Sequence, residues 1–141
     1  MINSVYIIGS LRNDKVVDVA NQIRGAGIEA FDDWFSPGPE ADDYWKKYAE
    51  RRTLTYKEAL KGHAARHVFE FDKFHIDRCD AALLVQPAGK SGHLELGYVL
   101  GRGKPGYILL DTDNTRWDVM LQFATGLVES VEEFLSVVRS K

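Results

Sequence analysis

The chain has 141 residues, of which 45% are apolar and 28% are charged, and its formal net charge is −3. These values predict one soluble domain with a sizeable hydrophobic core. They show no excess of positive charge of the kind that binds a nucleic-acid polymer. The sequence shows no signal-peptide pattern and no apolar run of membrane length, so we expect a cytoplasmic protein with no membrane partner.

The cysteine and histidine content predicts neither a disulfide nor a metal site. Cys79 is the single cysteine, and its apolar setting is typical of a small buried hydrophobe. The histidines are spread out, and CxxC and HExxH patterns are absent from the sequence. We therefore predict no metal and no cofactor.

In the first quarter of the chain, two short apolar runs flank a helical pattern. Residues 5–8 and 28–31 are predicted strands. Asn13 or Asp14 can cap the helix between them. Its inner face is predicted to hold four residues: Val16, Val17, Ala20 and Ile23.

Residues 34–60 exceed what a minimal fold needs and are rich in aromatic side chains. These are Trp34, Phe35, Tyr44, Trp45, Tyr48 and Tyr56. Such an insertion could form a lid that stacks on a flat ligand, with Trp34 as the substrate-binding residue. A subunit interface or a small satellite core explains the same pattern equally well.

The segment 64–80 has apolar residues at helical spacing, which predicts one buried stripe: Ala65, Val68, Phe69, Ile76 and Cys79. Asp72 falls near the centre of that stripe. An unpaired buried carboxylate is unfavourable, so Asp72 needs a partner, a raised pKa or a function. Asp80 precedes the next strand, where a backbone contact explains it better than catalysis.

The second half of the chain continues the alternation of strands and helices. Strands are predicted at 81–85, 107–110 and 127–128, and a short helix at 117–124. Ser91 can cap a helix that runs to about residue 102. Ser130 opens a capping box for a last helix, whose inward residues are Val131, Phe134, Leu135 and Val138.

This order of elements predicts a single α/β domain over residues 1–141. Its expected architecture is doubly wound and flavodoxin- or Rossmann-like, with a five-stranded, mostly parallel sheet and helices on both faces. Ligands of such sheets bind at the carboxyl ends of the strands, so the loops after residues 8, 31, 85 and 110 should meet there.

Two carboxylates and one loop near this edge are candidates for chemistry. Glu95 lies near the start of the predicted helix after residue 91, where the helix dipole would favour an ionised nucleophile or stabiliser, although ordinary helix electrostatics also explains it. Residues 9–13 have the place of a phosphate or ribose loop. Tyr6 can reach the site or pack in the core. A pair formed by Asp72 and Glu95 would suit glycosidic bond cleavage.

Four motifs together resemble the nucleoside 2-deoxyribosyltransferase superfamily, which includes nucleoside 5′-monophosphate N-glycoside hydrolases. They are VYIIGSLRN from residue 5, Asp72 eight residues before Asp80, GHLELGY from residue 92 and GKP from residue 103. The resemblance implies that Glu95 is the nucleophile, that Asp72 contacts the sugar and orients the nucleophile, and that Tyr6 lies in the sugar pocket. It also implies a homodimer or larger homo-oligomer, in which residues 118–120 reach a neighbouring subunit's site.

The chain departs from the family at the position that handles the base. Transferases usually carry an Asp six residues before the nucleophile, where this chain has Gly89. The hydrolases often have a Ser there, whereas this chain has Ser91. A 5′-phosphate could be held by Ser10, Arg12 and Ser91, with Lys90 or His93, which favours a nucleotide hydrolase.

We therefore predict an enzyme that cleaves the N-glycosidic bond of a nucleoside or nucleoside 5′-monophosphate, as a hydrolase or as a deoxyribosyltransferase. The expected catalytic residues are Glu95, Asp72 and Tyr6. The expected substrate-binding residues are Gly9, Ser10, Arg12, Asn13, Trp34, Ser91, Gly92, His93, Asp118 and Met120. Two alternatives stay open: a TIR-like domain that cleaves or binds NAD, and a non-catalytic nucleotide-binding or interaction module.

Overall fold

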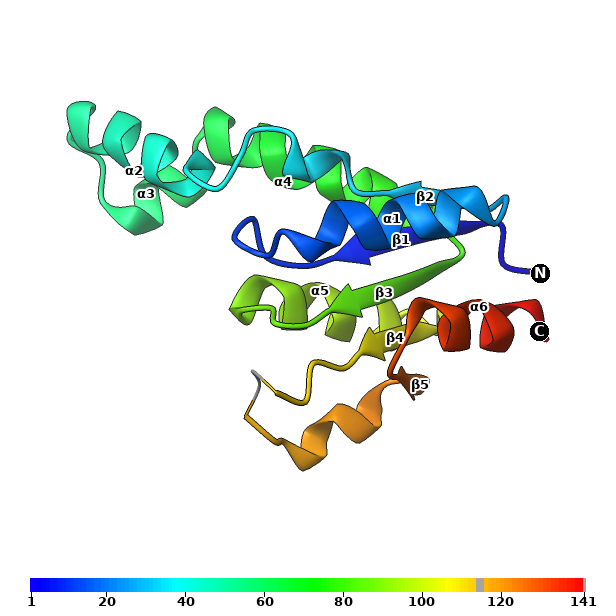
Figure 1. The fold of residues 1–141 in the computed structure, drawn as a ribbon. Coiled ribbons are helices and arrows are strands. Elements are labelled where there is room, and N and C mark those ends of the chain that lie inside the picture. Colours follow the sequence, from blue (N-terminus) through cyan, green and yellow to red (C-terminus); the bar gives the residue numbers. More distant parts are fainter. Residues whose placement is uncertain (114–115, 141) are drawn as a thin grey trace.

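The computed structural model describes residues 1–113 and 116–140, which form a three-layer α/β domain around a parallel sheet (Figure 1). The strand order is β2-β1-β3-β4-β5. The strands are β1 (Ser4–Ile8), β2 (Glu29–Phe31), β3 (Ala81–Val85), β4 (Gly106–Leu109) and β5 (Gly126–Val128). All four pairings are parallel, which confirms the predicted sheet.

Helices cover both faces of the sheet because successive side chains of each strand point to opposite sides. On one face, Val5 and Ile7 of β1 pack with α1 (Lys15–Gly25) and α6 (Val131–Arg139). On the other face, Tyr6 and Ile8 pack with α4 (His63–Arg78) and α5 (Lys90–Gly101). The doubly wound architecture is therefore confirmed.

Several local predictions need correction. Val17 is half-buried while Val19 is buried, because the inner face of α1 follows residues 16, 19, 20 and 23. Ser91 does not cap α5, whose N-cap is Gly89. The predicted helix at 117–124 is a short 3₁₀ turn, η2 (Val119–Phe123), capped by Asp118. Ser130 caps α6 as predicted, since its Oγ accepts from the Glu133 amide at 3.0 Å, but the box does not close on Ser130, because the Glu133 carboxylate accepts from the Glu129 amide at 2.8 Å.

The apolar stripe on α4 is only partly buried, which corrects the prediction of a continuous core face. Ile76 and Cys79 are buried, but Val68 and Phe69 are 57% and 61% exposed. The reason is positional, because the first half of α4 extends past the carboxyl ends of the strands (Figure 1). In that region the sheet offers the helix no surface to pack against.

The aromatic-rich segment forms a helical arm beside this part of α4 (Figure 1). The arm consists of η1 (Asp33–Phe35), α2 (Ala41–Arg51) and α3 (Tyr56–Leu60), and α3 packs against α4. Trp45 and Tyr56 meet edge to face at 6.2 Å, although Tyr56 is otherwise exposed. Within the described residues, no helix combines the length and the apolarity needed to cross a membrane.

Lys104 fixes the C-terminal end of α4 to the loop before β4. Its ammonium group donates hydrogen bonds to the carbonyl oxygens of Asp77 and Cys79, the latter at 2.8 Å. The last carbonyls of a helix have no partner within the helix, so a cation there satisfies them and complements the helix dipole.

Replacing Lys104 with Met should therefore destabilise the domain while keeping the apolar stem of the side chain. Loss of these charged hydrogen bonds is expected to lower the free energy of unfolding by about 2 kcal/mol. Urea denaturation measures the change, with Lys46→Met on the exposed face of α2 as the control. Equal stability of the two variants would contradict this role of Lys104.

Candidate active site

Three polar side chains meet on the sheet face covered by α4 and α5. They are Tyr6 from β1, Asp72 from α4 and Glu95 from α5. The Tyr6 hydroxyl donates a hydrogen bond to Glu95, and the charge of Asp72 acts on both of its neighbours. The structure thus brings together the three residues that the sequence predicted as catalytic.

A stack of rings sets the position of Tyr6 and α4. Tyr6 is 1% exposed and stacks on Phe31 of β2 at 5.4 Å. Phe31 stacks in turn on His75 of α4 at 3.9 Å. Because Tyr6 and Phe31 are register partners in the sheet, this stack ties α4 to two strands. Asp72 lies about one turn before His75 and is thereby held above β1.

Gly92 allows α5 to approach β1 closely enough for Glu95 to reach Tyr6. A Cβ atom at residue 92 would lie 3.1 Å from the Ile8 Cγ2 and 3.3 Å from the Ala88 Cβ. Gly92 is buried in this contact. In the described structure it therefore serves to pack α5 against β1 and does not offer an exposed surface to a substrate, where the sequence had predicted a substrate-binding residue.

Burial is the main influence on both carboxylic acids. It raises the pKa of Asp72 to about 6. Burial and the charge of Asp72 together raise the pKa of Glu95 to about 7, although the hydrogen bond from Tyr6 lowers it. The expectation that the helix dipole keeps Glu95 ionised is wrong, because Glu95 lies five residues after Lys90, beyond the first turn of α5.

The pair therefore holds a proton near neutral pH, and Asp72 and Glu95 titrate as coupled groups. None of the ion pairs among the described residues involves either carboxylate. Because its pKa is the higher of the two, Glu95 holds this proton, and it becomes a nucleophile when it loses the proton, while Asp72, already ionised, can accept a hydrogen bond from a sugar hydroxyl.

The loop after β1 divides into structural and accessible residues. Gly9 is needed because a Cβ there would lie 2.8 Å from the Val16 Cγ2. Asn13 is buried and donates from Nδ2 to the carbonyl oxygens of Val85 and Pro87, at 3.2 and 3.4 Å. Asn13 is thus occupied in joining the loops after β1 and β3.

Two other residues of this loop have polar groups nearer the solvent. Ser10 is half-buried, and its Oγ accepts from the Arg12 amide at 3.1 Å. Arg12 is exposed and lies 3.8 Å from the Asp43 carboxylate of the arm. These contacts leave the Arg12 guanidinium largely in solvent.

Trp34 contacts the end of β1 rather than standing free as part of a lid. Its indole N–H donates to the Ile7 carbonyl oxygen at 2.8 Å, and its ring packs against both core clusters. A Cβ at Gly9 would lie 3.7 Å from this ring. The position of Trp34 is therefore fixed by the core, next to the loop after β1.

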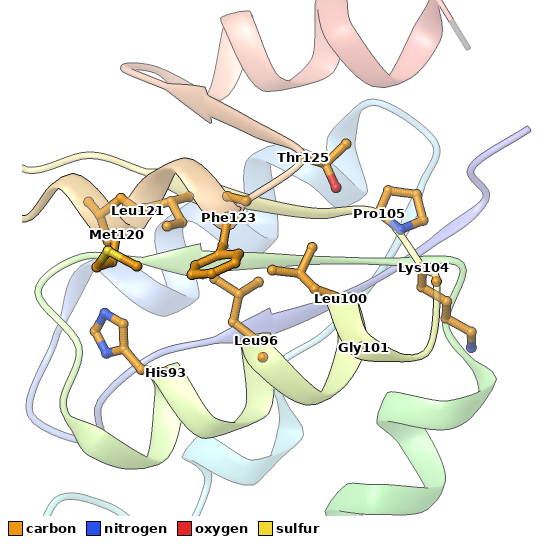
Figure 2. A pocket seen from close by; sticks show the side chains of 14 residues that line it. His93, Leu96, Leu100, Gly101, Lys104, Pro105, Met120, Leu121, Phe123 and Thr125 are labelled. Carbon is orange, nitrogen blue, oxygen red and sulfur yellow. The ribbon is translucent and has the colours of Figure 1, made fainter.

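The remaining predicted residues lie on the other side of α5. His93 and Met120 line an open apolar groove of about 740 Å³ between α5 and η2, and Figure 2 shows them at the same end of it. Asp118 and His93 line a smaller adjoining pocket. Ser91 is exposed on the first turn of α5. The described lining of neither hollow includes Tyr6, Asp72 or Glu95, so these hollows do not join Asp118 and Met120 to the carboxylates.

The sequence reasoning missed the residues that hold α4 and α5 in place. Phe31 and His75 form the ring stack, and Tyr98 on α5 donates to Asp77 on α4. The sequence signal for the contact between Tyr98 and Asp77 was weak. The spacing of Lys73 and Asp77 predicts an ion pair on one helix, but it does not show that Tyr98 of another helix also binds Asp77.

Comparison with known proteins finds similarity in structure. No family model and no curated protein matches the chain. The fold is similar to that of a 2-deoxyribosyltransferase from Bacillus psychrosaccharolyticus, with a TM-score of 0.60 and 15% sequence identity. The match covers 93% of this chain and 89% of the transferase chain, so the similarity extends over nearly the whole domain. At this identity it establishes a shared fold.

Substituting Glu95 by Gln should stabilise the protein at alkaline pH. The raised pKa of about 7 means that folding favours protonated Glu95, and this contribution is lost as the pH rises from about 4.5 through 7. Glutamine does not ionise in this range, so the variant should exceed the parent by about 3 kcal/mol at pH 8 and equal it at pH 4.

Chemical denaturation at the two pH values measures this difference. Glu50→Gln, on the exposed side of α2, is the matched control and should show no such change between pH 4 and pH 8. A Glu95→Gln advantage that is the same at both pH values would contradict the burial of an ionisable Glu95.

Proposed function

We propose that this protein cleaves the N-glycosidic bond of a nucleoside or nucleoside 5′-monophosphate, with Glu95 as the nucleophile. The observation that carries the proposal is the meeting of two carboxylic acids and a tyrosine in one apolar setting. The similarity of the fold to a 2-deoxyribosyltransferase supports it. The motif resemblance around Tyr6, Asp72 and Glu95 points to the same chemistry.

In the proposed reaction, ionised Glu95 attacks the anomeric carbon of the sugar. The electrons of the breaking C–N bond pass to the base, which leaves with a proton taken up from solvent or an acid. Asp72 binds a sugar hydroxyl, and the hydrogen bond from Tyr6 orients the Glu95 carboxylate. Water then releases the sugar from the glycosyl ester in a hydrolase, whereas a second base does so in a transferase.

Hydrolysis of a nucleotide is the version that the surrounding residues favour. A transferase must exchange a proton with the incoming base, and the chain has Gly89 at the position from which a carboxylate would do this. The exposed Arg12 and the half-buried Ser10, on the loop after β1, are suited to a 5′-phosphate. Ser91, on the first turn of α5, adds a further hydroxyl group.

Mass spectrometry of 2′-deoxynucleosides and their 5′-monophosphates should show release of the free base. Glu95→Gln preserves the shape of the side chain and should lower the rate on the order of 10³-fold, because the nucleophile is lost. Glu50→Gln is the control and should keep the parent rate.

Two outcomes of this experiment would contradict the proposal. One is the absence of base release from every nucleoside and nucleotide. The other is release that survives in Glu95→Gln. Nicotinamide release from NAD without cleavage of nucleosides would instead identify the TIR-like alternative.

We also propose that the chain forms a homodimer or a larger homo-oligomer. Four large apolar side chains of α4 support this, because Val68, Phe69, Phe71 and Phe74 are between 47% and 63% exposed. Light scattering should give at least twice the chain mass of 15.9 kDa. Phe69→Glu should lower that mass, whereas a monomeric parent protein would contradict the assembly.

A further inference from the structure

A cluster of polar groups joins α4 to α5 beside the two carboxylates. The Tyr98 hydroxyl of α5 donates to Asp77 Oδ1 of α4 at 2.6 Å. Lys73 of α4 donates to Asp77 Oδ2 at 2.9 Å, and Arg102, the C-cap residue of α5, lies 3.8 Å from Oδ1. Asp77 thus receives groups from both helices, and its pKa is lowered first by Tyr98 and then by Lys73.

The ring of Tyr98 is held as firmly as its hydroxyl. The Lys73 ammonium lies 5.6 Å from the ring centroid and the Arg102 guanidinium 5.5 Å from it, so one cation comes from each helix. A short hydrogen bond to an ionised acceptor is also stronger than one between neutral groups. These contacts together fix Tyr98 relative to α4.

This cluster is close to the candidate nucleophile along both helices. Tyr98 follows Glu95 by three residues, which is less than one turn of α5, or about 4.5 Å along its axis. Asp77 follows Asp72 by five residues, or about 7.5 Å along α4. A shift of α4 against α5 at the Tyr98–Asp77 contact therefore moves Asp72 relative to Glu95.

We propose that Tyr98 and Asp77 are positioning residues that set the separation of Asp72 and Glu95. The proposal rests on the proposed function for its catalytic meaning. Neither residue is required to touch the substrate. The hydrogen bond between them limits how far α5 can move from α4, and this distance decides how strongly the two carboxylates interact.

Loss of the hydroxyl in Tyr98→Phe should leave the domain folded. Asp77 keeps Lys73 and Arg102, and Lys104 still binds the C-terminal carbonyls of α4. The carboxylates, however, become free to separate. Weaker repulsion from Asp72 and easier access of water both lower the pKa of Glu95, so the two effects have the same sign. The other group that faces Glu95, Tyr6 of β1, is unchanged.

The chain offers a matched control for this substitution on the opposite face of the sheet. Tyr107 is buried in the cluster with Phe134, and its hydroxyl is the one buried side-chain polar atom without a hydrogen-bond partner among the described residues. Tyr107→Phe makes the same chemical change without removing a bond and without touching α4 or α5.

Carbon-13 NMR titration of the Glu95 carboxyl, assigned with Glu95→Gln, tests the proposal without any substrate. Tyr98→Phe should lower the pKa of Glu95 by about half a unit or more relative to Tyr107→Phe. Asp77→Ala removes the same hydrogen bond together with the ion pairs to Lys73 and Arg102, so it should lower the pKa of Glu95 at least as far, and adding Tyr98→Phe to it should change the pKa little. The proposal would be overturned if the pKa of Glu95 were the same in Tyr98→Phe as in Tyr107→Phe.

Kinetics with the nucleotide that the parent protein cleaves provides the second readout. Tyr98→Phe should lower kcat roughly tenfold or more with KM changed less than about twofold, since misplaced groups slow the chemical step. If Tyr98→Phe only made the protein less stable, the acid limb of its pH–rate profile would stay where it is in the parent. If Tyr98 positions the carboxylates, the lower pKa of Glu95 in the variant should move that limb to lower pH. If the parent releases no base, the proposed function fails, and the NMR titration still decides the role of Tyr98.

Discussion

The repulsion between two neighbouring carboxylates is the constraint on which the rest of the site depends. Asp72 and Glu95 lie in an apolar setting that raises the pKa of each, and the charge of Asp72 raises that of Glu95 further. Left to itself, such a pair would separate or remain protonated. The ring stack through Phe31, the close approach at Gly92 and the Tyr98–Asp77 contact hold the two helices together against this repulsion.

The same constraint accounts for how the fold distributes its residues. On the sheet face under α1 and α6, the buried side chains form a continuous apolar core. On the face under α4 and α5, the apolar cluster is smaller and is joined by the polar groups of Tyr6, Asp72 and Glu95. Burying ionisable groups lowers stability at a pH where they are charged. A domain with a second, fully packed face can tolerate that loss, and it keeps the acids in the environment that their chemistry needs.

The alternation of short apolar runs with helical patterns was sufficient to predict a mostly parallel sheet, and Asp72 stands out in the sequence because it interrupts an apolar stripe. The residues alone left open whether Tyr6 reaches the site or packs in the core, and the family resemblance implied its place beside the two acids. It was not sufficient to predict that Val68 and Phe69 are exposed, because periodicity shows which side of a helix is apolar but not where the sheet below it ends. The packing roles of Asn13 and Gly92 were also missed, because they depend on contacts with distant strands.

The central claim is that Glu95 attacks the sugar and forms an ester with it. Its most direct test is the mass of protein quenched in acid during turnover, followed by mapping of the modified peptide. The account predicts an added deoxyribosyl group, with its phosphate when the substrate is a nucleotide, on the peptide that contains Glu95 and on no other. Turnover with the modification on a different residue, or a Glu95→Gln protein that still acquires it, would contradict the account.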